Sequence, residues 1–311
     1  MALTINTNMA SLQAQHALSS STKSLNSSIQ RMTTGYKINS AKDDAAGLAV
    51  ANKMKVKLSS VSVAESNVQL GSSMLDTIEG NYEVIQDHLQ RIRDLTEQSA
   101  NGTYSTDSLT AISSEISQRL DEITRVANST EYNGLYLLNG DFGEKGKKGI
   151  DLQVGITSST NSVIHLDGSL FNSIQASALT WMVKAKNTDG KDVDATGMKQ
   201  QEFADTCAGL GTKTNLEGTK GANQMLAVLD KAIATITERT TLLGATQNRL
   251  ESASDALQVQ SDNLTSSLST VRDADVAAES SAYISAQILQ SASASLLSTA
   301  NQTPSIALNL I

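Results

Sequence analysis

Residues 226–271 read LAVLDKAIATITERTTLLGATQNRLESASDALQVQSDNLTSSLSTV, and this stretch decides the fold class. One aliphatic row recurs along it at every seventh residue: Leu229, Ile236, Leu243, Leu250, Leu257, Leu264 and Val271. An unbroken seven-residue repeat is typical of a long helix that faces one neighbour along its whole length. At 1.5 Å per residue this helix would be about 69 Å long. A compact chain of 311 residues would be only about 50 Å across, so the pattern predicts an elongated molecule.

The second row of the same repeat is partly polar. Thr240, Gln247, Ser254 and Ser261 occupy positions that would be apolar in a free coiled coil. These side chains bury little apolar area, so the helix needs further helices around it. The fold class that we predict is therefore mainly α: an elongated antiparallel helical bundle or coiled coil, with paired terminal helices and a small region that contains a β-hairpin.

Composition agrees with long helices and limits the possible partners. The chain has one proline and 3% aromatic residues, so little interrupts helices and few bulky side chains could line a ligand pocket. A net charge of −8 is unfavourable for a nucleic-acid partner, which requires a clustered basic face. No apolar run is long enough to span a bilayer, and no signal-peptide pattern opens the chain, so we expect no membrane insertion.

Both ends of the chain carry thin apolar rows at helical spacing, within residues 1–34 and 276–311. Short polar residues and alanines separate the apolar ones, and few charges are available for ion pairs along the helix. Such rows are marginal in isolation, because most helical stability comes from packing an apolar face. The residues concerned are Ile5, Met9, Leu12, Leu25, Ile29, Met32, Ile284, Ile288, Leu289, Leu296, Leu297, Leu308 and Leu310.

Between the ends the pattern predicts two more long helices and a hairpin. The first helix would follow a cap at Ser40 or Asp43 and end near Ser99. The second would follow a cap at Asp107 or a neighbouring Ser or Thr and carry an apolar row from Leu109 to Val126. Residues 150–166 alternate as two strands joined by a short turn, and residues 170–221 lack sustained periodicity. We expect the latter to form a short exposed insert.

No pattern in the sequence points to catalysis. The three histidines, His16, His88 and His165, fall on three different expected elements, and we expect His88 at a boundary or surface position. The metallopeptidase motif H-E-x-x-H is absent, and Gly209-Leu-Gly211 lacks the third glycine of a phosphate-binding loop. We therefore expect no enzyme, no cofactor and no metal site.

Several motifs at the two ends resemble those of bacterial flagellins. Residues 34–49 read TGYKINSAKDDAAGLA, which resembles the family signature. The N-terminal motifs are Ile5-Asn-Thr-Asn8 and Ser11-Leu12-Gln-Ala14, and the C-terminal ones are Asn248-Arg-Leu-Glu-Ser-Ala253, Asp273-Ala-Asp275, Gln287-Ile-Leu-Gln290 and Ala300-Asn-Gln302. Paired terminal motifs in this order are specific to the family.

The resemblance implies a division into three parts. Residues 1–42 and 272–311 would form a terminal-helix domain in which the apolar residues listed above make the polymerisation core. Residues 43–169 and 222–271 would form a helical-bundle rod domain with the β-hairpin at about 150–166. Residues 170–221 would be a short variable insert exposed at the surface.

The resemblance also implies a function, partners and a location. The chain would be exported unfolded, without a cleaved signal peptide, and would polymerise into the extracellular flagellar filament used for motility. Besides itself, it would meet a flagellar secretion chaperone and the filament cap and hook-junction proteins. Two alternatives are a hook–filament junction protein, which shares the terminal pattern, and a secreted adhesin or innate immune receptor ligand.

A receptor contact is implied by two further segments. Residues 90–95 and 114–120 resemble the flagellin segments that the vertebrate Toll-like receptor for flagellin recognises. On that resemblance the contacts would be Arg91, Leu95 and Glu115, which supply a forked cation, an apolar anchor and a carboxylate.

Overall fold

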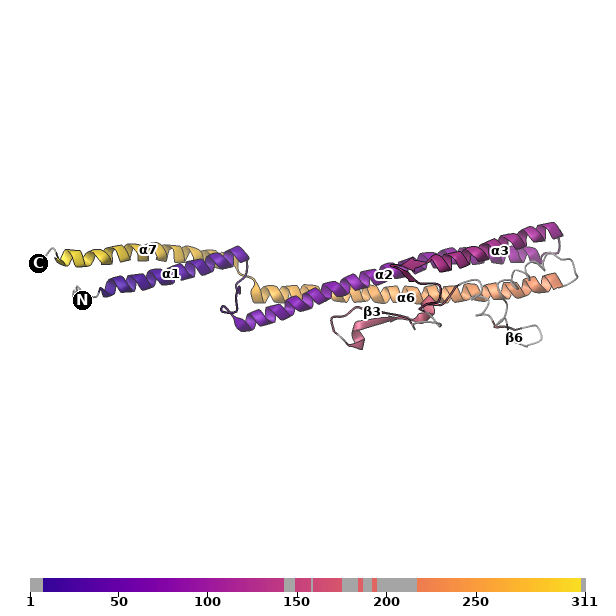
Figure 1. Ribbon diagram of the computed structural model, residues 1–311, viewed down its shortest axis with the longest axis horizontal. Coiled ribbons are helices and arrows are strands. Elements are labelled where there is room, and N and C mark those ends of the chain that lie inside the picture. Colours follow the sequence, from indigo (N-terminus) through magenta and orange to yellow (C-terminus); the bar gives the residue numbers. More distant parts are fainter. Residues whose placement is uncertain are drawn as a thin grey trace. The chain divides into compact units, whose positions relative to one another are not determined.

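The computed structural model describes residues 8–142, 149–157, 159–174, 184–186, 192–194 and 217–308, and it is mainly helical (Figure 1). The helices are α1 (Met9–Thr34), α2 (Ala45–Ala100), α3 (Thr106–Ser129), α6 (Glu217–Arg272) and α7 (Val276–Leu308). Short strands pair as β1 (Glu131–Tyr132) with β2 (Leu135–Tyr136), β3 (Ile150–Gln153) with β4 (Val163–Leu166), and β5 (Lys184–Lys186) with β6 (Asp192–Asp194). The predicted mainly α fold is confirmed.

The chain divides into two compact units. One comprises residues 1–60 and 260–311, and the other comprises residues 61–259, so that α2 and α6 contribute to both. The domain limits expected from the sequence stay a prediction. No helix in the described part of the chain is both long and apolar enough to cross a membrane.

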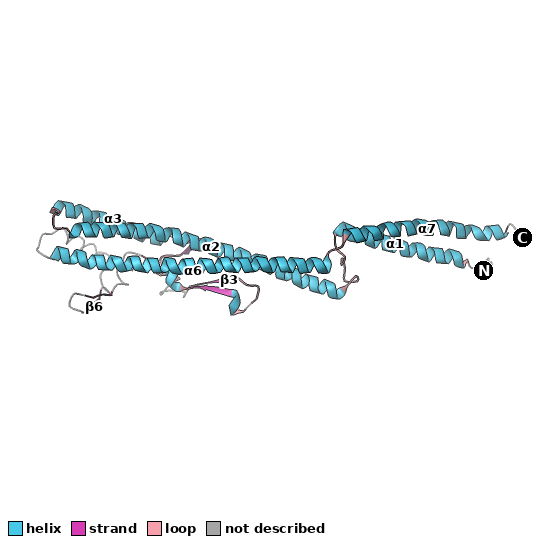
Figure 2. Ribbon diagram, turned by 180° about the vertical axis from the view of Figure 1, so that it is seen from behind, coloured by secondary structure: helices cyan, strands magenta, loops and turns pink. Residues whose placement is uncertain are grey.

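In the first unit α1 and α7 lie side by side and antiparallel (Figures 1 and 2). Asn8 caps α1 through its Oδ1, which accepts the Ser11 N–H at 3.1 Å, and its Nδ2 donates to the Ala300 carbonyl at 2.7 Å. Arg31 and Glu279 form an ion pair of 3.6 Å near the other end of the two helices. The side-chain amide of Asn8 thus joins the start of α1 to the last turns of α7.

The connections beside α1 and α7 pair through their backbones. Lys37 N–H donates to the Arg272 carbonyl at 2.7 Å, and Ala274 N–H donates to the Gly35 carbonyl at 2.9 Å. The Arg272 guanidinium lies 4.0 Å from the centre of the Tyr36 ring, a cation–π contact. Gly35 has a φ of +73°, the left-handed conformation in which glycine commonly ends a helix.

The cap of α2 is Asp44, which corrects the expectation of Ser40 or Asp43. Asp44 Oδ1 accepts the Gly47 N–H at 2.9 Å, as a capping side chain does. Asp43 Oδ2 instead turns back and accepts hydrogen bonds from the Asn39 N–H and from the N–H and hydroxyl of Ser40. These bonds, that of the Ser40 hydroxyl above all, lower the pKa of Asp43.

In the second unit α2, α3 and α6 form an antiparallel three-helix bundle (Figure 2). The long helix predicted over 226–271 is confirmed within α6. Its seven-residue row faces the core of this unit, because the members from Leu229 to Leu257 are at most 5% exposed. The apolar row of α3 is buried in the same unit, namely Ile112, Ile116, Leu120, Ile123 and Val126.

The predicted β-hairpin is confirmed and lies on α2. β3 and β4 are antiparallel, with Ile150 opposite Leu166 and Gln153 opposite Val163. Asn67 Nδ2 donates to the Gln153 carbonyl at 3.1 Å and thereby joins the hairpin to the helix. The Leu152 side chain lies against Gly71, where no side chain interferes.

The chain after the hairpin enters the core of the bundle. Leu170, Phe171 and Ile174 are fully buried, since they fill the space beside α2 and α6. The first residues of the insert expected at 170–221 therefore belong to the core of the bundle, and an exposed insert would begin after Ile174. Most of its remaining residues lie outside the described part of the chain, and their exposure stays a prediction.

Candidate functional site

Small residues form the contact between α1 and α7. The side chains that this unit buries in the two helices are those of Ala14, Ser28, Ala286, Ser293 and Ala300. Small side chains allow two helices to approach closely, but they remove little apolar surface from water. The pair therefore has a thin core of its own.

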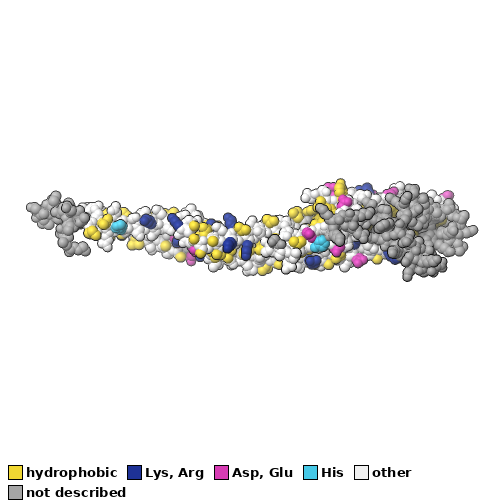
Figure 3. Space-filling model, turned by 60° about the horizontal axis from the view of Figure 1, so that its bottom comes forward, with side chains coloured by type: hydrophobic (Ala, Val, Ile, Leu, Met, Phe, Trp, Pro, Cys, Tyr) yellow, Lys and Arg dark blue, Asp and Glu magenta, His cyan; other side chains and the backbone are white. Residues whose placement is uncertain are grey.

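Most of the large apolar residues of α1 and α7 remain at the surface. Eight of them are between 38% and 67% exposed: Met9, Leu12, Ile29, Met32, Ile284, Ile288, Leu289 and Leu296. Hydrophobic side chains are visible on the face drawn in Figure 3. Many exposed large apolar side chains on one helix pair are typical of an interaction surface. The apolar side chains that α1 and α7 do not bury against each other are available for contact with another molecule.

Five further residues belong to the predicted polymerisation core. Leu25 and Leu297 are half-buried. Ile5 and Leu310 lie outside the described residues, as does the side chain of Leu308. The assignment of the whole set to a polymerisation core stays a prediction.

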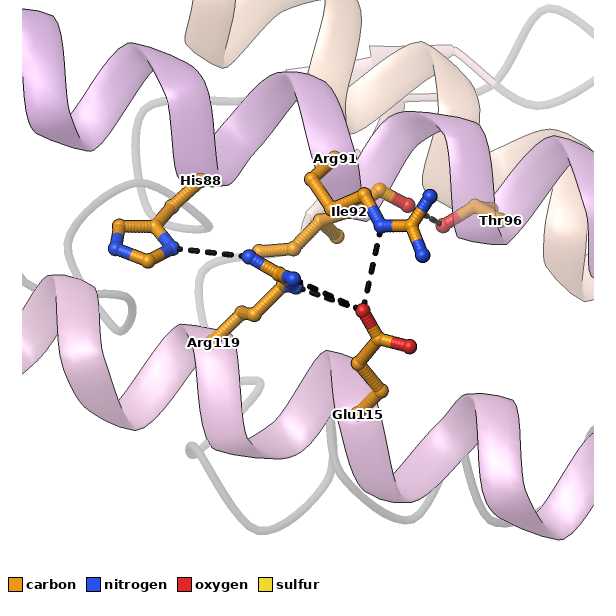
Figure 4. Close-up of polar contacts among 6 residues, drawn as sticks. All are labelled: His88, Arg91, Ile92, Thr96, Glu115 and Arg119. Atoms are coloured by element: carbon orange, nitrogen blue, oxygen red, sulfur yellow. Dashed lines mark hydrogen bonds and ion pairs between the residues drawn. The ribbon is translucent and has the colours of Figure 1, made fainter.

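The predicted receptor residues lie on α2 and α3, where four polar side chains meet (Figure 4). Glu115 Oε1 accepts hydrogen bonds from Arg119 Nε and Nη2, both at 3.0 Å, and from Arg91 Nε at 3.3 Å. Arg119 Nη1 donates to His88 Nδ1 at 3.3 Å, so His88 lies at the boundary of the bundle, as expected. The structure brings Arg91 and Glu115 together, and the resemblance that named these two residues did not indicate Arg119.

The charges of this cluster are in contact with water. The Arg91 side chain is 50% exposed and that of Glu115 is 38% exposed. The hydrogen bond from Arg119 in particular, and then that from Arg91, lowers the pKa of Glu115. Leu95, in contrast, is 2% exposed and points into the bundle, so it presents no surface to a partner in this arrangement.

Among the described residues, no group of three or more His, Cys, Asp and Glu side chains could hold a metal ion. His165 Nδ1 lies 2.6 Å from Asp151 Oδ1 on the exposed hairpin, and His88 contacts Arg119. The first contact joins the two strands of the hairpin, and the second joins α2 to α3.

Two polar contacts between the bundle helices and the segment after the hairpin were not predicted. The Tyr82 hydroxyl donates to the Leu170 carbonyl at 2.6 Å inside the bundle, and Arg239 Nη1 donates to the Asn172 carbonyl at 3.0 Å. Arg239 is only 5% exposed. In the sequence Tyr82 falls on the apolar row of its helix, and no sequence signal shows which backbone carbonyl its hydroxyl meets.

Two family models match the ends of the chain. The bacterial flagellin N-terminal helical region matches residues 5–142, and the bacterial flagellin C-terminal helical region matches residues 226–311. The chain belongs to the bacterial flagellin family. The two matched regions contain α1 to α3 and most of α6 and α7, the helices from which both units are built.

Flagellins of known identity align with the whole chain. Polar flagellin F of Vibrio parahaemolyticus is 32% identical, and flagellin C of Vibrio cholerae is 33% identical, each over 100% of both sequences. A flagellar filament 30.7 kDa core protein of Treponema maltophilum is 32% identical over 96% of this chain and 95% of its own length.

Among solved structures, a putative flagellar hook-associated protein from Vibrio parahaemolyticus has a similar fold. The TM-score is 0.55 and the identity 16%, over 74% of this chain and all of the other. At that identity the likeness concerns the fold alone, and the family models favour flagellin over the hook–filament junction alternative.

Membership of the flagellin family establishes the class of function. The chain is a structural subunit of the flagellar filament, and it assembles with copies of itself in that extracellular polymer. Flagellin is a family of structural proteins and not of enzymes. The exposed apolar faces of α1 and α7 are thus the surfaces to consider first for assembly.

Proposed function

We propose that this flagellin polymerises through α1 and α7, whose outer faces pack against the same helices of neighbouring copies. The observation that carries this proposal is which apolar residues the helix pair buries: small ones lie buried, and large ones are exposed. Ala14, Ala286 and Ala300 are buried between the helices, whereas Met9, Ile288 and Leu296 are each more than 60% exposed. A helix pair stable by itself would bury its largest apolar side chains.

The energetics of the two ends support coupled folding and assembly. Ordering one residue costs about 1–2 kcal/mol of backbone entropy. Buried apolar surface returns about 25 cal/mol per Å², and a seam of alanine and serine provides little of it. Neighbouring copies would cover the exposed Met, Leu and Ile side chains and supply the missing stabilisation.

The test compares two exposed apolar positions in different units. Ile288→Asn on α7 places a polar amide where the proposal requires an apolar contact, and Val84→Asn on α2 is the control at a 43% exposed position. We expect Ile288→Asn to abolish polymerisation of the purified full chain, as measured by sedimentation, with helical content retained. Val84→Asn should polymerise. Filaments of Ile288→Asn that form at the wild-type concentration would contradict the proposal.

Export is proposed to occur through the flagellar type III apparatus, in an unfolded state and without removal of a signal peptide. A secretion chaperone would cover the apolar face of α7 before export, and the filament cap and hook-junction proteins would be met at the growing end. The exposed Ile284, Ile288 and Leu289 support a chaperone contact on this helix. Intact mass of the filament subunit tests the processing: a mass that lacks N-terminal residues beyond the initiator methionine would contradict it.

A second candidate function is recognition by the Toll-like receptor for flagellin. The exposed ion pair between Arg91 and Glu115 favours it, because it offers a guanidinium and a carboxylate on adjacent helices. Burial of Leu95 leaves these two as the available contacts. Arg91→Ala should lower receptor signalling by purified monomer at least tenfold, whereas Arg125→Ala, at an exposed position of α3, should leave it unchanged. Equal signalling by Arg91→Ala and the wild type would exclude this role.

A further inference from the structure

The charges of this chain are unevenly divided between its two units. Residues 1–60 and 260–311 contain eight Lys and Arg against six Asp and Glu, whereas residues 61–259 contain 16 against 26. Within α2 the change is abrupt. Residues 45–60 contain three lysines and no acidic residue, and residues 61–90 contain five acidic residues and neither Lys nor Arg.

A groove of about 500 Å³ lies between α2 and α6 in the acidic unit. Val68 and Leu250 contribute apolar surface to it and are 4% and 1% exposed. Three carboxylates line the same groove, those of Glu65, Asp76 and Glu251, and its lining contains no Lys or Arg. The groove is thus lined mainly by polar and acidic side chains and carries a negative charge.

The side chains of the groove neutralise this charge only in part. Gln247 Nε2 donates to Asp76 Oδ1 at 3.0 Å and to Glu79 Oε2 at 2.8 Å, but an amide carries no net charge. Glu65 Oε1 is buried and has no hydrogen-bond partner among the described residues. A carboxylate oxygen in that position is unfavourable unless a cation lies near it.

A matching ridge occurs in the other unit. Lys53, Val56 and Lys57 have the spacing i, i+3, i+4, so they lie on one face of α2. All three are exposed, Val56 to 67%. The two lysine Cα atoms are about 6 Å apart along the helix, and their long side chains reach outward on either side of the valine.

We propose that the ridge of Lys53, Val56 and Lys57 in one copy docks in the groove of a second copy. Val56 enters the groove between α2 and α6, and the two ammonium groups pair with its carboxylates, those of Glu65, Asp76 and Glu251. The proposal rests on polymerisation as the function of this chain, and it adds a contact outside α1 and α7. Complementary charge identifies a second copy as the occupant, because the cationic ridge and the anionic groove belong to the same sequence.

The two surfaces are different, which has a consequence for the assembly. A contact between unlike patches leaves one patch of each kind free at the ends, so copies add without closing the assembly. This is the property that an open helical filament requires. The contact also makes polymerisation sensitive to salt, since exposed charges are screened over about 8 Å at physiological ionic strength.

Charge reversal at one groove residue tests the contact, with a matched control one helical turn away. Glu251→Lys changes the groove, whereas Asp255→Lys makes the same change on α6 at an exposed position that does not line it. We expect Glu251→Lys to raise the critical concentration for polymerisation of the full chain about tenfold. Asp255→Lys should leave it within about twofold. Circular dichroism of the monomers checks folding, and Glu251→Gln provides a milder variant if the lysine destabilises the bundle.

The reciprocal change decides whether the ridge is the partner. Lys57→Glu alone should raise the critical concentration as well, and Lys57→Glu combined with Glu251→Lys should restore most of the loss. The inference is overturned if Glu251→Lys and Asp255→Lys change the critical concentration equally. It is also overturned if the double variant polymerises no better than the single variants. A wild-type chain that does not polymerise contradicts the proposed function itself, so the two failures are distinguishable.

Discussion

The Tyr82 hydroxyl donates a hydrogen bond of 2.6 Å to the backbone carbonyl of Leu170, 88 residues away and inside the bundle. Tyr82 is fully buried, as are Leu170 and Phe171 beside it. The bond therefore holds the segment that follows the β-hairpin against α2. It also satisfies a buried carbonyl that no helix or strand partner reaches.

Removal of this hydroxyl should destabilise the bundle. Tyr82→Phe leaves the Leu170 carbonyl buried and unpaired, which costs about 1–3 kcal/mol of unfolding free energy. Tyr104→Phe is the control, because the Tyr104 hydroxyl accepts a hydrogen bond of 2.7 Å from Gln98 at an exposed site. Urea denaturation of the monomer measures both. Equal midpoints for Tyr82→Phe and the wild type would show that the bond contributes nothing.

The same tyrosine should respond to alkaline pH. Burial raises the pKa of Tyr82 to about 12, against a smaller opposite effect of Arg239. Because the folded-state pKa lies above the unfolded value of about 10, the associated stability is complete below pH 10 and is lost as the pH rises toward 12. Absorbance titration at about 295 nm should show one tyrosine ionising later than the others. That late step should be absent in Tyr82→Phe.

Two glycines within α2 should respond differently to alanine. A Cβ at Gly80 meets no atom within 4 Å, so Gly80→Ala should stabilise the bundle by about 1 kcal/mol through helix propensity alone. A Cβ at Gly71 would lie 2.5 Å from Leu152 Cδ1, so the hairpin side chain must move. Gly71→Ala should gain less than Gly80→Ala, or lose stability. Equal gains in thermal unfolding would show that the hairpin does not rest on Gly71.

The predicted insert should tolerate an epitope tag in its later part but not at its buried start. Insertion after Phe171 interrupts residues that are fully buried, so we expect it to prevent folding of the bundle. Insertion after Gly190 falls in the sequence predicted to be exposed, and it should leave filaments intact and labelled on their outside. Electron microscopy with a tag-specific antibody reads out both. A tag after Gly190 that is masked in intact filaments would contradict the predicted exposure.

Hydrogen exchange should separate the two units of the monomer. The amides of α1 and α7 should exchange rapidly in dilute monomer, because the pair buries chiefly small side chains. Those of α2 and α6 around Ile78 and Ile236, both fully buried, should be protected. Polymerisation should protect α1 and α7 as well. Slow exchange of the terminal amides in dilute monomer would contradict coupled folding and assembly.

The sequence by itself determined the long helices, the hairpin and the family. Rows such as Leu229 to Val271 allow only one secondary structure, because a seven-residue apolar period does not fit a strand. The alternation of Ile150, Leu152 and Val154 predicted the hairpin for the corresponding reason. These features depend on residues close together in the chain, which is why a single sequence suffices for them.

Only the tertiary structure decided which way the side chains of those elements face. The apolar row of α1 and α7 could have packed inward, but the close approach of Ala14, Ala286 and Ala300 turned Met9 and Ile288 outward. The same applies to the receptor residues, where Arg91 stayed exposed and Leu95 was buried against the bundle. A helical period identifies a face but not its neighbour, since that neighbour is brought in from a distant part of the chain.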